Sequence, residues 1–200
     1  MHKSKTLPGI RGVVFDMDGT LTVSNLDFDA IRNECGVDHG IPLLEFLESA
    51  PEEQRRRVQA VLERHEKRAA LECELRDGAR EVVREFARRG LKTALLTRNS
   101  AESVRTVMAR FGLEFDCWIS REQARPKPAP DAVLEIARRL GLSPAELVVV
   151  GDYVFDVHAG RDAGSATVFV TTKNSIAPPE EADFVVDNLR GLLRLMPESA

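Results

Sequence analysis

The sequence predicts an α/β protein built on a doubly wound parallel sheet, with a second, small helical domain. Short apolar runs alternate with amphipathic helical patterns through the second half of the chain, which is typical of a parallel sheet with helices between its strands. One run, at residues 147–150, is continuously apolar, as in a strand that is covered on both faces. The segment 22–76 has no comparable strand pattern. We therefore expect one α/β core that is interrupted by a helical insertion.

The first strand is predicted from the apolar run at residues 13–15. Two aspartates, Asp16 and Asp18, follow it at once and are themselves followed by Gly19 and Thr20. Because carboxylates are costly to bury, two of them at the end of a buried strand indicate a chemical role as well as a turn.

The segment 22–76 is predicted to be a helical cap. Residues 51–76 form the longest helical pattern, and residues 27–47 carry weaker helical pieces that Gly36, Gly40 and Pro42 interrupt. The apolar face of the long pattern is made by Val58, Val61, Leu62, His65, Ala69 and Leu75. We place the core domain at residues 8–21 and 77–200 and the cap at residues 22–76.

The later elements alternate between strand and helix up to residue 170, and a last strand follows without a predicted helix before it. Helix Ser100–Gly112 has a polar start and a glycine stop, and helix Ala129–Gly141 is expected to turn Val133, Leu134, Ile136, Ala137 and Leu140 inward. A third helix is predicted at Val154–Ala163. The strands are predicted at Leu91–Thr97, Cys117–Ser120, Glu146–Asp152, Ala166–Val170 and Asp183–Val186.

Composition and charge restrict the classes of partner. The chain has 200 residues and a formal net charge of -4, which provides no general attraction to nucleic acid or to an anionic membrane. The arginine run 55–57 is interleaved with acidic residues, so we interpret it as a solvated helix face. No apolar run is long enough for a membrane-spanning helix.

The N-terminal residues and the cysteines bear on the cell compartment. The N-terminal residues lack the apolar segment of a signal peptide. Cys35, Cys73 and Cys117 are too few and too scattered for a disulfide framework. We expect them to be buried, reduced thiols in a cytoplasmic protein.

Polar side chains collect where the predicted strands end. Thr97, Arg98 and Asn99 close one strand, and Gly151 and Asp152 close another, with Asp156 four residues on. Lys127 stands between two prolines in a loop before a helix. In an open parallel sheet these ends share one edge, where ligands bind. Each element alone has an ordinary explanation as a turn or a helix cap, but the ordered set indicates a shared site.

Converging carboxylates repel one another unless a cation compensates them. Carboxylate, carbonyl and water oxygens suit magnesium, whereas His39, His65 and His158 are too scattered to indicate zinc. Magnesium with a lysine and a hydroxyl is typical of a phosphate-handling site. There, one carboxylate can attack phosphorus to give an aspartyl-phosphate, and a second carboxyl can exchange protons with the leaving group and with water.

These residues resemble the four ordered motifs of the haloacid dehalogenase-like (HAD) hydrolase superfamily. The motifs are Asp16-Met17-Asp18-Gly19-Thr20, Thr97 after an apolar strand, Lys127 in RPKPAP, and Gly151-Asp152 with Asp156. The resemblance covers residues 13–21 and most of residues 77–170. It implies a Rossmann-like HAD core, and the helical insertion after the first motif resembles the cap of the phosphoglycolate phosphatase-like branch.

The resemblance implies a role for each matching residue. Asp16 is the expected nucleophile and a magnesium ligand, and Asp18 is the expected general acid and base, which binds magnesium through its backbone carbonyl. Thr97 and Lys127 are expected to bind the transferring phosphoryl group. Asp152 is the third expected protein ligand of magnesium, with Asp156 behind it.

Substrate contacts are expected from residues around these motifs, namely Gly19, Thr20, Arg98 and Asn99. Arg98 is a departure, because many phosphatases of this branch have asparagine directly after the threonine. Arg98 either reaches the phosphate or another anionic part of the substrate, or it points to solvent. In the cap, the candidate specificity residues are Asn25, Asp27, Arg32 and the loop 36–42, although they can equally serve only to shape the cap.

The predicted function is therefore a magnesium-dependent phosphatase, a HAD-type phosphoric monoester hydrolase that acts on a small phosphorylated metabolite. A phosphomutase of the β-phosphoglucomutase type shares all four motifs and is the alternative. A non-catalytic binding protein is disfavoured by the complete motif set. Carbon–halogen chemistry is disfavoured by Asp18, which phosphate-processing members of the superfamily have and dehalogenases lack.

Overall fold

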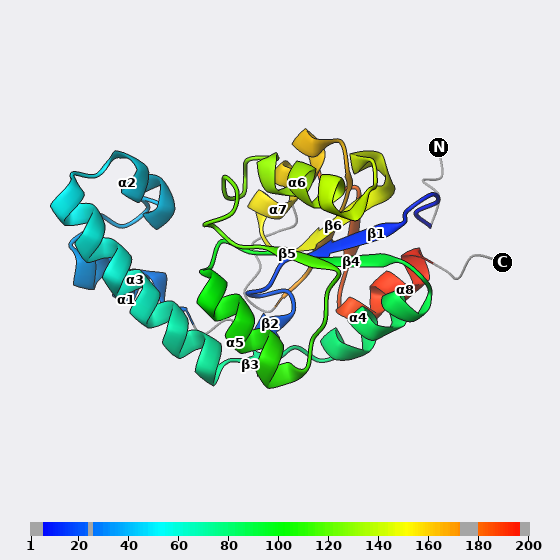
Figure 1. The fold of residues 1–200 in the computed structure, drawn as a ribbon, viewed down its shortest axis with the longest axis horizontal. Helices are drawn as coiled ribbons and strands as arrows, with labels where there is room; N and C mark the ends of the chain where they lie inside the picture. The colour runs from blue at the N-terminus through cyan, green and yellow to red at the C-terminus, as the bar shows by residue number, and fades with distance from the viewer. Residues whose placement is uncertain (1–5, 24–25, 173–179, 197–200) are drawn as a thin grey trace. The chain divides into compact units, whose positions relative to one another are not determined.

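Six parallel strands form one sheet at the centre of the larger part of the chain (Figure 1). The computed structural model describes residues 6–23, 26–172 and 180–196. The strand order is β5-β4-β1-β6-β7-β8, and all five neighbouring pairs are parallel. The strands are β1 (Gly12–Phe15), β4 (Lys92–Leu96), β5 (Cys117–Ile119), β6 (Leu147–Gly151), β7 (Ala166–Val170) and β8 (Phe184–Val186). The predicted doubly wound parallel sheet is confirmed.

Helices cover both faces of this sheet, as the crossovers between parallel strands require. Figure 1 shows α4 (Ala79–Arg88), α5 (Ala101–Phe111) and α8 (Leu192–Leu195) on one face, and α6 (Asp131–Leu140) and α7 (Val154–Ala163) on the other. Two short 3-10 turns, η1 (Pro144–Glu146) and η2 (Leu189–Gly191), precede β6 and α8. Both faces of the strands are therefore buried, which explains their continuous apolar runs.

The strand β1 connects the two halves of the core. Val14 packs in the cluster that includes α6 and α7, whereas its neighbour Phe15 stacks on Phe86 of α4, with ring centroids 6.2 Å apart. Successive side chains of a strand point to opposite faces, so β1 anchors both helical layers. Its position is therefore fixed from two sides.

The sheet has a topological switch point beside β1. From β1 the chain moves outward to β4 and β5, and it then crosses to β6 and moves outward the other way through β7 and β8. In β1 and β6, Phe15 lies opposite Val150, and the backbone N–H of Asp16 donates to the carbonyl of Val150 over 2.9 Å. A crevice at the carboxyl ends of two such strands is where ligands bind in this architecture.

The predicted patterns of α5 and α6 agree with the structure, except at one residue of α6. For α5, the Ser100 side chain accepts from the Ser103 N–H and Gly112 ends the helix with φ +57°, as predicted from its polar start and glycine stop. On α6, Leu134 is 44% exposed, so its predicted inward orientation is wrong. The buried stripe of α6 is Ala132, Val133, Ile136 and Ala137, and Leu134 lies beside it on the solvent side.

Residues 24–73 form a second compact unit, separate from residues 1–23 and 74–200. Its helices are α1 (Phe28–Cys35), α2 (Leu43–Ser49) and α3 (Glu52–Glu72). They enclose a small apolar core of Ile31, Cys35, Val37, Leu43, Val58, Val61 and Leu62. A helical insertion in an α/β chain is thus present.

The long helix α3 is shorter than predicted. It ends at Glu72, and Leu75 lies in β3 (Glu74–Leu75), which pairs antiparallel with β2 (Thr22–Val23). This two-stranded ribbon belongs to the larger unit. The helical pattern was extended too far because pairing with β2 draws residues 74–75 into an extended conformation that their own sequence does not signal.

The predicted specificity residues of the helical unit have contacts within their own segment. Asp27 caps α1 by accepting from the Ala30 N–H over 2.9 Å, and Gly36 ends the same helix with φ +70°. Arg32 donates to the carbonyl of Ile41 over 3.0 Å. These residues stabilise α1 and the following loop, while Asn25 lies outside the described residues.

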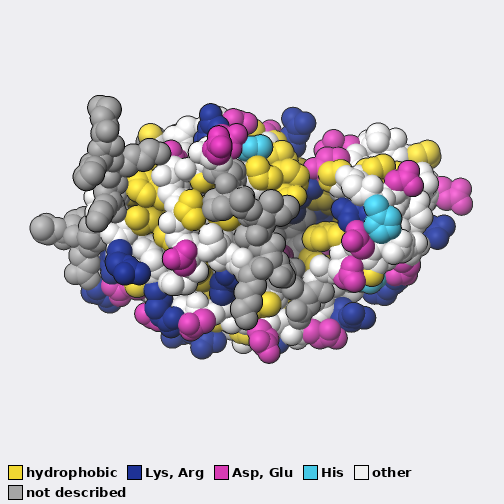
Figure 2. Space-filling view, turned by 180° about the vertical axis from the view of Figure 1, so that it is seen from behind, with side chains coloured by type: hydrophobic (Ala, Val, Ile, Leu, Met, Phe, Trp, Pro, Cys, Tyr) yellow, Lys and Arg dark blue, Asp and Glu magenta, His cyan; other side chains and the backbone are white. Residues whose placement is uncertain are grey.

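The surface charges are mixed in sign (Figure 2), and two of the three thiols are buried as predicted, whereas Cys117 is only half-buried. In the described part of the chain, no helix combines the length and the apolar character that crossing a membrane requires. Figure 2 shows basic and acidic side chains interspersed on the visible face. The three cysteines are free thiols, of which Cys35 and Cys73 are buried and Cys117 is half-buried. The absence of a nucleic-acid or membrane partner stays a prediction.

We predict that Phe86→Ala destabilises the core by about 3–5 kcal/mol, because it removes a fully buried ring and leaves a cavity against Phe15. Urea unfolding followed by circular dichroism measures this loss. The control is Leu134→Ala, which removes a half-exposed side chain and is expected to cost less than about 1 kcal/mol. Equal losses in both variants would contradict the assignment of the core.

Candidate active site

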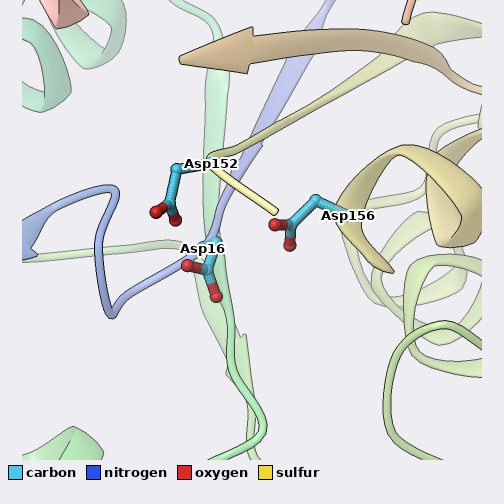
Figure 3. Close-up of side chains that lie close together, drawn as sticks. All are labelled: Asp16, Asp152 and Asp156. Carbon is cyan, nitrogen blue, oxygen red and sulfur yellow. The ribbon is translucent and has the colours of Figure 1, made fainter. Parts of the chain in front are cut away.

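Three carboxylates meet at the switch point of the sheet (Figure 3). Asp16 directly follows β1, Asp152 directly follows β6, and Asp156 lies in the first turn of α7. One carboxylate oxygen from each lies within 4.8 Å of the others. These three are the one such acidic, histidine or cysteine group found among the described residues.

Two glycines make room for these carboxylates. A Cβ atom on Gly151 would lie 2.0 Å from Cγ of Asp156, and one on Gly19 would lie 2.2 Å from an oxygen of Asp152. Gly19 also has φ +86°, a conformation that side chains with a Cβ rarely adopt. Both positions must therefore be glycine, because a Cβ atom there would clash with the side chain of Asp156 or of Asp152.

Lys127 joins two of the three carboxylates. Its side chain is buried, with 4% of its surface exposed, although it comes from a loop. The ammonium Nζ donates to Oδ1 of Asp16 and to Oδ1 of Asp156, each over 2.5 Å, and to the carbonyl of Leu96 over 3.4 Å. The structure thus brings together the lysine and the aspartates that the strand-end pattern places at one edge.

The other predicted residues surround this cluster. Thr20 donates its hydroxyl to Oδ1 of Asp152 over 3.0 Å, so it supports a carboxylate of the site. The side-chain amide of Asn99 donates to Oδ2 of Asp18 over 2.6 Å, and its backbone N–H donates to the hydroxyl of Thr97 over 3.1 Å. Asn99 thereby connects the ends of β1 and β4.

Arg98 lies beside the site in a different direction. Its guanidinium donates a hydrogen bond to the backbone carbonyl of Lys127 and lies over the ring of Phe155, 4.9 Å from the ring centroid. Two alternatives were predicted for Arg98, contact with an anionic part of the substrate or exposure to solvent. The structure shows its guanidinium against a carbonyl and an aromatic ring, and a contact between Arg98 and the substrate stays a prediction.

The electrostatics of the cluster follow from its burial and its excess of negative charge. Burial, and then the charges of Asp156 and Asp152, raise the pKa of Asp16 well above its ordinary value against the opposing effect of Lys127. Burial and the charge of Asp156 raise the pKa of Asp152 to about 6. For Lys127, burial lowers the pKa, but the carboxylates of Asp156 and Asp16 outweigh it and the net shift is upward.

The donors fit a hard divalent cation. The cluster has three carboxyl groups for one ammonium, so it carries an excess of negative charge once the three are ionised. All of its carboxyl donors are oxygens. Asp156 already accepts from Lys127 and, through Oδ2, from the backbone N–H of Tyr153 over 3.1 Å. Asp16 and Asp152 are therefore better placed than Asp156 to be ligands, and their role as ligands stays a prediction.

Sequence reasoning missed two side chains near this cluster. Phe155 had no signal apart from its place between Asp152 and Asp156. Arg76 donates its backbone N–H to the carbonyl of Leu21 over 2.8 Å, and its charge lowers the pKa of Asp152 against the stronger effect of burial. Its Nε is buried and has no hydrogen-bond partner among the described residues. Only the folded chain brings Arg76 beside the first motif.

A cavity of about 440 Å³ lies at the start of α4 and is lined by residues 75–81, Arg84 and Arg190. Arg190 fills part of its polar lining by pairing with Asp77 over 2.6 Å and with Glu81 over 2.8 Å. None of the three clustered aspartates lines this cavity. The chemistry of the site therefore points to the switch point rather than to this cavity.

Comparison with known proteins gives a consistent family. A family model described as haloacid dehalogenase-like hydrolase matches residues 10–164. The chain is 33% identical over 212 residues to an uncharacterised hydrolase of Saccharomyces cerevisiae, and the match covers 98% of this chain and 96% of that protein. It is 27% identical over 218 residues to the N-acetylmuramic acid 6-phosphate phosphatase of Pseudomonas aeruginosa, covering 94% and 95% of the two chains.

The fold has close counterparts among solved structures. A hydrolase from Pseudomonas syringae superposes with a TM-score of 0.78, covering 92% of this chain and 96% of that chain, at 21% identity. At this identity the likeness concerns the fold alone.

We predict that Asp152→Asn stabilises the metal-free protein at about pH 7.5, by up to about 3 kcal/mol. The pKa of Asp152 is about 6 in the folded protein and 3.8 for an ordinary aspartate, so the folded state binds the carboxyl proton of Asp152 more tightly than the unfolded state does. The folded state therefore loses stability as the pH rises from about 4 to about 6. An asparagine has no proton to lose and avoids this loss. Urea unfolding in the presence of a chelator measures it, and the gain should shrink toward pH 4.5.

The control is Asp116→Asn. Burial raises the pKa of Asp116, but hydrogen bonds from Lys92 and from the Thr93 N–H outweigh it and the net shift is downward. Removal of this carboxylate should therefore destabilise the protein at neutral pH. A variant Asp152→Asn that is less stable than the natural chain in metal-free buffer would contradict the electrostatic account.

Proposed function

The chain belongs to the haloacid dehalogenase-like hydrolase family, and we propose that it is a magnesium-dependent phosphatase that hydrolyses a small phosphorylated metabolite through an aspartyl-phosphate. Its family was predicted correctly from the four motifs. That membership, together with a phosphatase among its relatives, confirms the predicted enzyme class, a phosphoric monoester hydrolase. The magnesium, the intermediate and the residue roles are our proposal.

One observation carries the proposal: the Lys127 ammonium is held between Asp16 and Asp156, with Asp152 in the same cluster. A buried lysine that bridges two carboxylates fixes the rotation of the Asp16 side chain at the end of β1. It also places positive charge where the oxygens of a transferring phosphoryl group gain negative charge. This arrangement supports attack by an aspartate on phosphorus.

In the first step, a carboxylate oxygen of Asp16 forms a bond to phosphorus as the bond between phosphorus and the leaving oxygen breaks. Asp18 donates its proton to that oxygen, which leaves as an alcohol. Asn99 donates to Oδ2 of Asp18 and so orients the carboxyl group that exchanges the proton. The hydroxyl of Thr97 accepts from Asn99, so its hydrogen can be donated to the phosphoryl group.

In the second step, Asp18 takes a proton from a water molecule as the water oxygen attacks phosphorus. The bond between phosphorus and Asp16 breaks, and inorganic phosphate and the free carboxylate are produced. Asp18 thus returns to its starting protonation state. Lys127 contacts the same Asp16 carboxylate in both steps.

Magnesium, when bound to Asp16, Asp152 and the backbone carbonyl of Asp18, would supply the positive charge that the cluster lacks and would neutralise phosphoryl oxygens. Burial, and then the charges of neighbouring carboxylates, raise the pKa values of Asp16 and Asp152. A bound cation would favour the ionised form of both, which supports this choice of ligands. The helical unit of residues 24–73 completes the proposal as a cap that contributes substrate specificity. A cytoplasmic location stays a prediction.

The proposal is tested with a panel of phosphomonoesters, with and without magnesium, on the natural chain and on Asp16→Asn. We expect phosphate release that requires magnesium and falls at least about 1000-fold in Asp16→Asn. Asp18→Asn should fall by at least about 100-fold. The matched control is Asp162→Asn, an exposed carboxylate on α7, which should keep full activity.

Hydrolysis is distinguished from phosphomutase activity by a reaction in ¹⁸O-labelled water. A phosphatase incorporates the label into the released phosphate, whereas a mutase returns the phosphoryl group to a sugar and releases little phosphate. Full activity in Asp16→Asn, or no phosphate release from any ester, would contradict the proposal.

We further predict that magnesium binding weakens as the pH falls through about 6. Protons compete with the cation for Asp152, whose pKa is about 6, so binding should be roughly tenfold weaker at about pH 5 than at about pH 7.5. Isothermal titration calorimetry with magnesium measures this. Equal affinity at the two pH values, or unchanged affinity in Asp152→Asn, would exclude Asp152 as a ligand.

A further inference from the structure

We propose that Arg98 is a positioning residue that holds the Lys127 loop against the start of α7 and so fixes the Lys127 ammonium between Asp16 and Asp156. The inference deepens the proposed function, on which it rests, because it explains how the lysine of that site is kept in place. It also replaces the expectation that Arg98 contacts the substrate.

The Lys127 loop needs an external anchor. Lys127 has a proline on each side, and proline has no backbone N–H to donate. The loop therefore loses two of the donors that could bind it to the rest of the fold. Arg98 supplies a donor from outside the loop, by bonding to the carbonyl of Lys127 itself. This contact acts on the residue whose side chain enters the cluster.

The same guanidinium also contacts the segment that carries Asp156. It lies over the ring of Phe155, 4.9 Å from the centroid, and Phe155 directly precedes Asp156. Tyr153 packs edge-on against that ring, with centroids 4.9 Å apart, and its backbone N–H donates to Asp156 over 3.1 Å. Arg98 thus joins the two segments whose side chains form the Lys127–Asp156 ion pair.

This double contact suits arginine in particular. A planar guanidinium can stack on an aromatic face and donate from its edge at the same time, whereas a lysine ammonium is a point charge with no flat surface. A residue that bound substrate would need its guanidinium turned toward the phosphoryl group. The observed orientation toward a carbonyl and a ring favours positioning.

The first experiment compares two substrates of one shape, phenyl phosphate and 4-carboxyphenyl phosphate, on the natural chain, Arg98→Met and Arg98→Lys. A positioning role predicts that kcat falls roughly 10- to 100-fold in Arg98→Met, by the same factor for both substrates and with KM little changed. Arg98→Lys should recover only part of the activity. The control is Arg105→Met, which removes an arginine stacked on Trp118 at 5.6 Å and should keep full activity.

The second experiment does not depend on activity. Brief acetylation with acetic anhydride, followed by peptide mass mapping, measures the exposure of Lys127 relative to Lys92, whose side chain is 52% exposed. Lys127 should be protected in the natural chain and in Arg105→Met. Lys127 should be modified several-fold faster in Arg98→Met and in Phe155→Leu. The second variant keeps Arg98 and removes the aromatic ring on which Arg98 stacks.

The outcomes separate the two hypotheses. A rise in KM with unchanged kcat, or a larger loss of kcat/KM for the carboxylated substrate, would make Arg98 a substrate contact and overturn the inference. Unchanged Lys127 labelling in Arg98→Met would overturn it as well. If the natural chain releases no phosphate from any ester of the panel, the proposed function fails, and the labelling still decides whether Arg98 holds Lys127. If Arg98→Met does not fold, Arg98→Lys and Phe155→Leu give the same readouts.

Discussion

The site depends on one buried ion pair network, in which the Lys127 ammonium lies between Asp16 and Asp156. Taking three charged groups out of water is costly, and removing one partner of such a buried pair typically costs about 3–5 kcal/mol. The lysine favours the ionised form of Asp16 at the end of a buried strand. Lys127 does not also neutralise Asp152, and the remaining negative charge of the cluster favours the binding of a divalent cation.

The topology of the sheet brings these groups together. Asp16, Lys127 and Asp156 are far apart in sequence, and they meet because β1 and β6 are parallel neighbours at the switch point. This much was predictable from the sequence. Continuous apolar runs show which strands are buried, and the polar residues that follow them must lie at one edge if the strands are parallel. The apolar runs and the residues that end them therefore suffice to place the motif residues along that edge.

The contacts made by side chains across the site were not predictable in the same way. Arg98 and Asn99 follow Thr97 in sequence, yet one contacts the Lys127 carbonyl and the other contacts Asp18. Rotamer and packing decide between such partners, and the local sequence does not record them. Arg76 is a further example, since its place near the first motif depends on the pairing of β2 with β3. Leu134 shows the same limit on a helix, where a residue at the border of the apolar stripe can be exposed or buried.

The central claim is that the Asp16 carboxylate attacks phosphorus with Lys127 at its side. Its most direct measurement is to quench a reacting sample in acid, reduce any aspartyl-phosphate with borohydride, and locate the modified residue by mass spectrometry. We expect homoserine at position 16 and at no other aspartate. Modification of a different residue, or none while phosphate is being released, would contradict the claim.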